Sequence, residues 1–299
     1  MTKARDIASA TTPNANAALL ATFPHKNLII NGAMQVAQRG TSFTPSGVTY
    51  CLDRFAHYAP SAPSNAVQQS TDVPSSEGFQ YSVRMDTVDL RHAVELLSNG
   101  EAGIFYNGQR LTLSFWAKTG SSTKSATINI RFIDGAAFGN VSSAFSSSNN
   151  SIVITDSWQR FSIQYTVDTT PTASHYACGF SISGSANILY ITGVQLEVGD
   201  TATPFEHRSY GEELALCQRY YVNSISASIY NQGNVNHILR VALPVEMRVN
   251  PTITRTGSFW SGAENAPDIY PQYGNKKAFL ISGGTSTFLG GSFLSDAEL

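Results

Sequence analysis

Alternating apolar and polar residues in the middle of the chain are the feature that most limits its fold. Residues 110–118 read RLTLSFWAK, so every second residue from Leu111 to Phe115 is apolar. The same period recurs over 126–133 and 158–167. A period of two places the apolar side chains on one face of a β-strand. Polar loops, with no amphipathic helix among them, separate these strands, which predicts antiparallel sheets packed face to face.

A second constraint lies in residues 190–221, which read YITGVQLEVGDTATPFEHRSYGEELALCQRYY. Apolar residues alternate with polar ones until Gly199 ends the strand, and an extended segment follows. A short helix is predicted over 209–221, because Ser209 and Glu212 have the spacing of a capping box. The stretch therefore closes one β-rich unit and opens another.

Shorter patterns complete the expected elements. Residues 27–39 predict two short strands, with a turn at the Asn-Gly pair at 31–32. Residues 90–97 fit a helical turn, a strand or a loop edge. A Pro-, Gly- and Asn-rich stretch at 257–275 predicts a long loop. Further strands are expected at 81–85, 176–182, 188–198, 225–230, 236–243, 251–255 and 279–281.

These elements predict an all-β fold: an antiparallel jelly-roll β-sandwich, a short linker helix and a second, smaller β-sandwich-like domain. The expected boundaries are 27–208 for the jelly roll, 209–221 for the helix and 222–299 for the C-terminal domain. Residues 1–26 form an N-terminal arm that is rich in Ala, Thr, Asn and Pro and has too little to bury alone. The arm is either a loose terminus or a segment that orders against a partner chain.

Composition narrows the possible partners. Only 13% of the residues are charged, against about 25% in ordinary soluble proteins. The net charge of −2 gives no case for binding nucleic acid, because domains that bind phosphates usually carry a basic stripe. No apolar run approaches the roughly 18 residues of a membrane span, and the N-terminus lacks the apolar region of a signal peptide. The odd number of cysteines, Cys51, Cys178 and Cys217, favours buried thiols over a disulfide framework.

Catalytic patterns are weak, and no catalytic residue, metal or cofactor is expected. Asp53 and His57 are four residues apart, but no G-x-S-x-G pattern accompanies them. Asp86 and Asp89 resemble solvated turn residues more than a catalytic acid pair. The histidines are scattered without the spacing of zinc ligands.

Aromatic residues are the better candidates for ligand binding. Trp260, Tyr270 and Tyr273 fall in the predicted long loop, where exposed aromatic rings often serve recognition. Contact with a ligand or receptor is one interpretation, and packing between subunits is the other. Trp116 and Trp158 flank strong strands and are expected in the core.

Several stretches together resemble the tail-fibre or tail-associated virion proteins of tailed bacteriophages, which carry a carbohydrate-binding-like jelly roll. Residues 190–221 resemble the domain-closing motif of these proteins almost throughout. The other matching stretches are TKARDIA at 2–8, NLIINGAMQVAQRG at 27–40, DRF at 53–55, LTLSFWAK at 111–118 and DAEL at 296–299.

The resemblance implies a non-enzymatic virion protein that exposes its β-sandwich to host surface glycans. It implies docking on other virion proteins through residues 1–26 and a homotrimer, in which strand edges are closed against neighbours. Such a protein would be made in the host cytoplasm without a signal peptide. A purely structural capsid-decorating or head-fibre protein is the alternative, and a glycan-active enzyme is the weaker one.

The resemblance also bears on calcium. Related jelly rolls often hold a structural calcium ion with an acidic residue after the NLIxNG strand and an aspartate on the last strand. This chain has Gln35 at the first position and ITGV at 191–194. Calcium requires several oxygen ligands with net negative charge, so no calcium site is expected.

Overall fold

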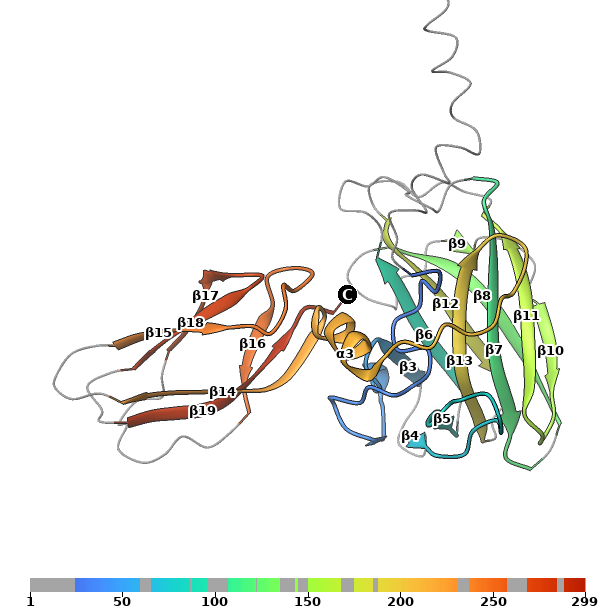
Figure 1. Cartoon of the computed structure of the whole chain (residues 1–299), viewed down its shortest axis with the longest axis horizontal. Coiled ribbons are helices and arrows are strands. Elements are labelled where there is room, and N and C mark those ends of the chain that lie inside the picture. The colour runs from blue at the N-terminus through green and yellow to red at the C-terminus, as the bar shows by residue number, and fades with distance from the viewer. Residues whose placement is uncertain are drawn as a thin grey trace, which may run out of the picture. The chain divides into compact units, whose positions relative to one another are not determined.

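The computed structural model describes residues 25–59, 66–86, 88–95, 107–121, 123–134, 143–144, 150–167, 175–184, 188–230, 237–256, 268–283 and 288–298 (Figure 1). These residues form antiparallel strands and one α-helix, and they divide into two compact units. The first unit holds the described parts of 1–35 and 41–207. The second holds 36–40 and 208–298. No described helix is long and apolar enough to span a membrane.

The first unit is built from two antiparallel sheets. One has the strand order β1 (Ser42–Phe43), β4 (Val67–Ser70), β5 (Ser82–Met85), β13 (Leu189–Val198), β7 (Arg110–Thr119) and β11 (Gln159–Thr166). The other has the order β10 (Asn150–Ile154), β8 (Lys124–Asp134), β12 (His175–Gly184), β6 (Val88–Glu95), β3 (Phe55–Ala59) and β2 (Gly47–Tyr50), with β9 (Ser143–Ala144) beside β8. This arrangement confirms the jelly-roll β-sandwich predicted from the alternation.

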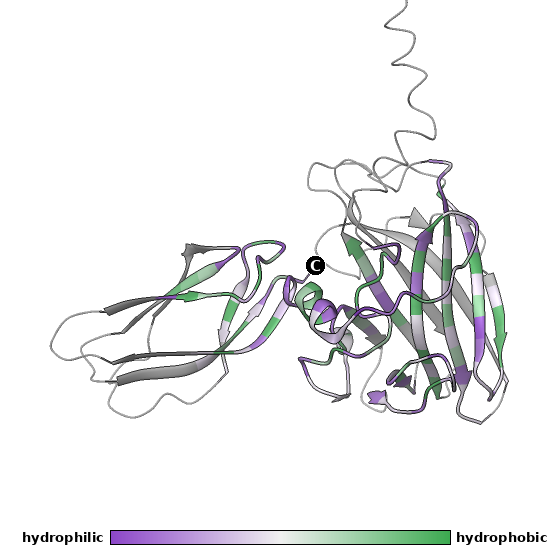
Figure 2. Ribbon diagram, viewed as in Figure 1, coloured by the Kyte–Doolittle hydropathy of each residue, from purple (hydrophilic) through white to green (hydrophobic). Residues whose placement is uncertain are grey.

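The core of this unit collects apolar residues of both sheets. Figure 2 shows hydrophobic and hydrophilic residues following one another along the described strands. Leu111, Leu113 and Phe115 are fully buried, as the period of two predicted. Each such side chain contributes roughly 1.5–3 kcal/mol through removal from water. Other buried members are Phe55, Val83, Met85, Leu90, Ala93 and Ile191.

The entry segment, residues 25–35, contradicts the prediction of two short strands at 27–39. No described residue between 25 and 41 belongs to a strand. Asn31 and Met34 have φ angles of 62° and 57°, which interrupt an extended chain. The apolar residues of this stretch, such as Ile29, are buried without forming a strand, so their pattern reflected burial alone.

The second unit begins with helix α3 (Tyr210–Gln218). Ser209 is its N-cap, and its side chain accepts a hydrogen bond of 3.3 Å from the Glu212 amide, as predicted. The helix is shorter than the expected range of 209–221, because Tyr221 starts the next strand. Cys217 on the helix and Cys51 in the first unit are both buried.

Two small sheets make up the rest of this unit. One has the order β14 (Tyr221–Tyr230), β19 (Phe288–Asp296) and β16 (Thr252–Arg255). The other has the order β15 (His237–Ala242), β18 (Ala278–Gly283) and β17 (Asp268–Asn275). Strand β17 lies inside the stretch predicted as a loop at 257–275, so that prediction is wrong for 268–275. The buried core comprises Val222, Val241, Leu243, Met247, Phe279, Phe293 and Ala297.

Residues 36–40, which precede the jelly-roll strands in sequence, belong to this second unit. The Arg39 guanidinium lies 3.5 Å from the centre of the Tyr221 ring. Arg39 also forms ion pairs of 3.3 Å with Asp296 and 3.6 Å with Glu298. Its side chain is only 10% exposed, so these contacts are largely shielded from water. The C-terminal strands therefore depend on a segment far away in the sequence.

Replacing Arg39 with leucine should destabilise the second unit by about 3 kcal/mol, because the change leaves the buried carboxylate of Glu298 without this cation. Hydrogen exchange over 221–225 and 292–297 reports the loss. The matched control is Lys277→Ala, which breaks the 3.1 Å ion pair to Glu246 between two exposed side chains. That change should be almost neutral. Equal effects of both substitutions would contradict the role given to Arg39.

Candidate functional site

Strand β13 is interrupted where the closing motif begins. Its pairing with β7 shifts register between Thr192 and Gln195. Gly193 at this bulge has a φ of 63°, and a Cβ atom there would lie 2.5 Å from the Phe79 ring. Glycine is therefore required by both conformation and space. The bulge frees the Val194 amide to donate a 2.9 Å hydrogen bond to the Gly32 carbonyl.

The Glu197 carboxylate and the Gln195 side-chain amide are held by hydrogen bonds within the motif. Glu197 accepts bonds of 2.5 Å from the Thr203 hydroxyl, 3.1 Å from the Thr203 amide and 2.9 Å from Gln195 Nε2. Gln195 in turn accepts 2.8 Å from the Glu206 amide. Both Gln195 and Glu197 are buried. These polar side chains hold the segment after β13 against the strand.

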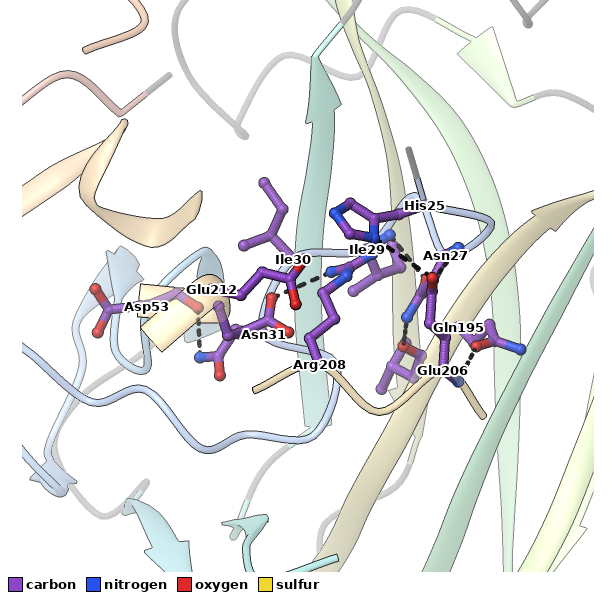
Figure 3. A network of polar contacts seen from close by, with 12 residues as sticks. His25, Asn27, Ile29, Ile30, Asn31, Asp53, Gln195, Glu206, Arg208 and Glu212 are labelled. Carbon is purple, nitrogen blue, oxygen red and sulfur yellow. Dashed lines mark hydrogen bonds and ion pairs between the residues drawn. The ribbon is translucent and has the colours of Figure 1, made fainter. Parts of the chain in front are cut away.

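The entry segment is tied into the same network through Asn27 (Figure 3). Its side-chain oxygen accepts from the amides of Ile29 (2.9 Å) and Leu196 (3.1 Å). Its side-chain nitrogen donates 3.2 Å to the Val194 carbonyl, and its backbone amide donates 2.8 Å to Glu206. We call this network of Asn27, Gly32, Gln195, Glu197, Thr203 and Glu206 the latch. It joins the beginning of the jelly roll to its last strand.

Residues 199–206, here called the strap, run back across the outer face of the six-stranded sheet (Figure 1). The Thr112 hydroxyl donates 2.8 Å to the Gly199 carbonyl. Gln164 and Arg160 donate to the carbonyls of Asp200 and Thr203. The polar side chains under the strap are thus occupied by the protein's own backbone. This part of the sheet is closed to a ligand.

Aromatic side chains extend this cover. Phe79, Phe205 and His207 form a mutually packed group, with ring centres 4.9–5.0 Å apart. Phe79 is buried and lies over the bulge at Gly193. The group therefore covers the sheet at the end of the strap, to which Phe205 belongs.

An open aromatic cluster lies at the other end of the same face. Lys118 Nζ is 5.0 Å from the centre of the Tyr190 ring and 5.7 Å from that of Trp158. Asp72 accepts a 3.1 Å hydrogen bond from Trp158 Nε1 and forms a 2.5 Å ion pair with Lys118. Trp158, Tyr190 and Lys118 are half-buried, and Asp72 is exposed. We call these four residues the aromatic cluster.

The described structure includes two of the three residues predicted as a binding site. Trp260 lies outside the described residues. Tyr270 and Tyr273 lie on strand β17, where Tyr270 pairs with Leu280, and not in a loop. The binding site formed by Trp260, Tyr270 and Tyr273 stays a prediction.

The core positions expected for Trp116 and Trp158 are wrong, since both are half-buried. Trp116 alternates with Phe115 and Ala117, which face the core, so it points to the outer face of β7. Trp158 has the opposite parity to the apolar residues of β11. The outer position of both tryptophans could have been predicted from the sequence. The core-facing residues of both strands have odd numbers, and the two tryptophans have even numbers.

The structure also shows the surroundings of the acidic and histidine residues considered as catalytic or metal-binding candidates. Asp53 and His57 are buried, at 1% and 0% exposure, so a substrate does not reach them. Asp86 forms a 2.9 Å ion pair with Arg84. Among the described residues, no group of three or more His, Cys, Asp and Glu side chains could hold a metal ion.

No protein-family model and no curated protein matches the sequence. Solved structures that resemble it include the enzymatically active domain of tailspike protein 4 from bacteriophage CBA120, at 16% identity and a TM-score of 0.34. That match covers 58% of this chain and 22% of the tailspike structure, so this chain spans about a fifth of it.

Two carbohydrate-binding structures are similar to a comparable degree. The CBM22-1–CBM22-2 tandem of Paenibacillus barcinonensis Xyn10C has 10% identity and a TM-score of 0.37, with 91% of this chain and 98% of that chain covered. TmCBM61, solved with β-1,4-galactotriose, has 15% identity and a TM-score of 0.31, with 58% and 100% covered. Likenesses of this size assign no residue role or activity to this chain.

Proposed function

We propose that the protein is a non-enzymatic structural protein of a tailed-bacteriophage virion, a tail fibre or tail-associated protein. Its β-sandwich would be exposed for adhesion to the host surface or its glycans. Residues 1–26 would dock on other virion proteins, and the chain would assemble as a homotrimer. The single observation that carries the proposal is the latch.

The latch supports the resemblance because it unites the two stretches on which the resemblance rests. Asn27 and Gly32 come from the NLIING stretch, and Gln195, Glu197, Thr203 and Glu206 come from the closing motif. Their polar groups are mutually satisfied at positions as much as 179 residues apart in sequence. The motif therefore specifies one closed domain and is not a chance string.

The same contacts favour a non-enzymatic role. Glu197 and Glu206 hold backbone amides, which fixes them in a structural task. Asp53 and His57 are sealed inside the first unit. A general acid or base must reach the substrate within hydrogen-bond distance, and these groups do not.

The alternative, a capsid-decorating or head-fibre protein without receptor recognition, is favoured by the strap. The strap covers part of strands β7 and β11 of the six-stranded sheet, which reduces the area available to a ligand. The aromatic cluster then has to supply any adhesive surface in the described part of this face.

Immunogold labelling tests the proposal. Antibodies raised against the full chain are applied to phage particles purified from lysed cells that carry its gene. The proposal predicts labels at the tail, and labels confined to the head would support the decorating alternative. Absence of the chain from purified particles, measured by mass spectrometry, would overturn both.

A further inference from the structure

A row of half-exposed side chains crosses the outer face of the six-stranded sheet. Gln68 lies opposite Arg84, Arg84 opposite Tyr190, and Tyr190 opposite Lys118 in the strand register. Gln159 lies opposite Ala117, so Trp158 is placed next to Lys118 at the start of β11. Residues directly opposite in antiparallel strands project from the same face. The row therefore crosses strands β4, β5, β13 and β7 and ends at Trp158, the residue before β11.

Covered residues border the row on one side. Two positions further along the strands from the Tyr190–Lys118 pair, Thr192 lies opposite Trp116. Thr192 is fully buried, and its hydroxyl donates 2.7 Å to the Tyr81 carbonyl. Phe79 covers the bulge beside it. The row thus lies on the outer face at one end of the sheet, and residues 79–81 border it.

The aromatic rings of the row are held in place before any ligand arrives. The centres of the Trp158 and Tyr190 rings are 6.4 Å apart and the angle between the ring planes is 66°, so the rings pack edge to face and are not stacked. Lys118 lies near both rings, and Asp72 fixes both Lys118 and Trp158. A site whose side chains are already ordered loses less entropy on binding.

We propose that this row binds an extended polysaccharide without strong charge, with Trp158 and Tyr190 as its stacking residues. The proposal rests on the proposed adhesive function and names the surface that would serve it. Ring faces provide apolar contact for the C–H groups of a sugar, while Gln68, Arg84 and Asp72 can exchange hydrogen bonds with its hydroxyls.

Charge and spacing argue for this ligand. The cations of the row are neutralised by neighbours, Lys118 by Asp72 and Arg84 by Asp86. A strongly anionic chain therefore gains little from them. Neighbouring strands are about 4.8 Å apart, so the row repeats at nearly the length of one sugar unit in an extended chain. Successive strands can then contact successive sugars.

The test measures binding of the full chain to an array of bacterial surface polysaccharides, followed by titration of those retained. Trp158→Ala and Tyr190→Ala should each weaken binding about tenfold or more, the loss typical of a central aromatic contact. Tyr210→Ala is the matched control, because Tyr210 is an exposed aromatic residue on α3, outside the row. It should leave the affinity unchanged.

The outcomes separate this inference from the proposed function. If the wild-type chain binds a polysaccharide and both row variants bind it with the wild-type affinity, the row is not the binding site, while the proposed adhesive function stands. If the wild-type chain binds none, both the row and the adhesive function are overturned. Thermal unfolding of each variant confirms that a loss of binding is not a loss of fold.

Discussion

Replacing Gly32 with alanine is expected to lower the free energy of unfolding of the jelly roll by about 3 kcal/mol or more. A Cβ atom at this position would overlap the carbonyl oxygen of Val194 and lie 3.3 Å from Asn27 Nδ2. The atom in the way is backbone, and the Val194 amide is itself bonded to the Gly32 carbonyl. The clash is relieved only by opening the latch. Urea denaturation of the full chain measures the loss.

Gly211→Ala is the control for this prediction. No atom lies within 4 Å of a Cβ built at Gly211, which is in helix α3. Alanine favours a helix over glycine by about 1 kcal/mol, so this change should be neutral or stabilising. A Gly32→Ala protein as stable as the wild type would show that the close approach of the two segments is not required.

Asn27→Leu should cost a similar amount, about 3 kcal/mol. Leucine has the same branched four-atom skeleton as asparagine but accepts no hydrogen bond, which leaves the amides of Ile29 and Leu196 without their side-chain acceptor. A buried donor that loses its partner costs roughly 1–3 kcal/mol. Hydrogen exchange at these two amides should accelerate along with the fall in global stability.

Gln80→Leu provides the comparison for Asn27→Leu. Gln80 is exposed, so the same loss of an amide group should change the stability little. If Asn27→Leu were also neutral, the latch would contribute nothing to folding. The resemblance of the closing motif would then need another physical explanation.

The β-sandwich could be predicted because a strand with one buried face alternates apolar and polar residues in the sequence. Leu111, Leu113 and Phe115 show this directly. The same rule failed at 27–39, where buried residues such as Ile29 belong to an irregular segment held by side-chain hydrogen bonds. Periodicity detects burial on one side, and it does not reveal how the backbone is satisfied.

The latch could not be predicted as a unit. Asn27 and Leu196 are 169 residues apart, and no local pattern indicates that one side chain will satisfy the other's amide. The motif residues were identified through resemblance, without their physical roles. The strap was likewise predicted only as an extended segment, because its cover over the sheet depends on long-range contacts with Arg160 and Gln164.

The aromatic cluster was missed for a simpler reason. Large aromatic residues beside strong strands are usually assigned to the core, and Trp158 was assigned in this way. Parity within strand β11 places it on the outer face. Tyr190 was predicted on a strand without a functional role, and only the register reveals that it lies opposite Lys118.

The proposed adhesive and non-catalytic role requires that the protein bind a polysaccharide without cutting it, and one measurement tests both. Full-length protein is incubated with bacterial surface polysaccharides, and bound protein and polysaccharide chain length are measured in the same samples. We expect the protein to be retained on at least one extended polysaccharide, with the chain length of that polysaccharide unchanged. Shortening of a bound polysaccharide would contradict the non-enzymatic role, and failure to bind any of them would contradict adhesion.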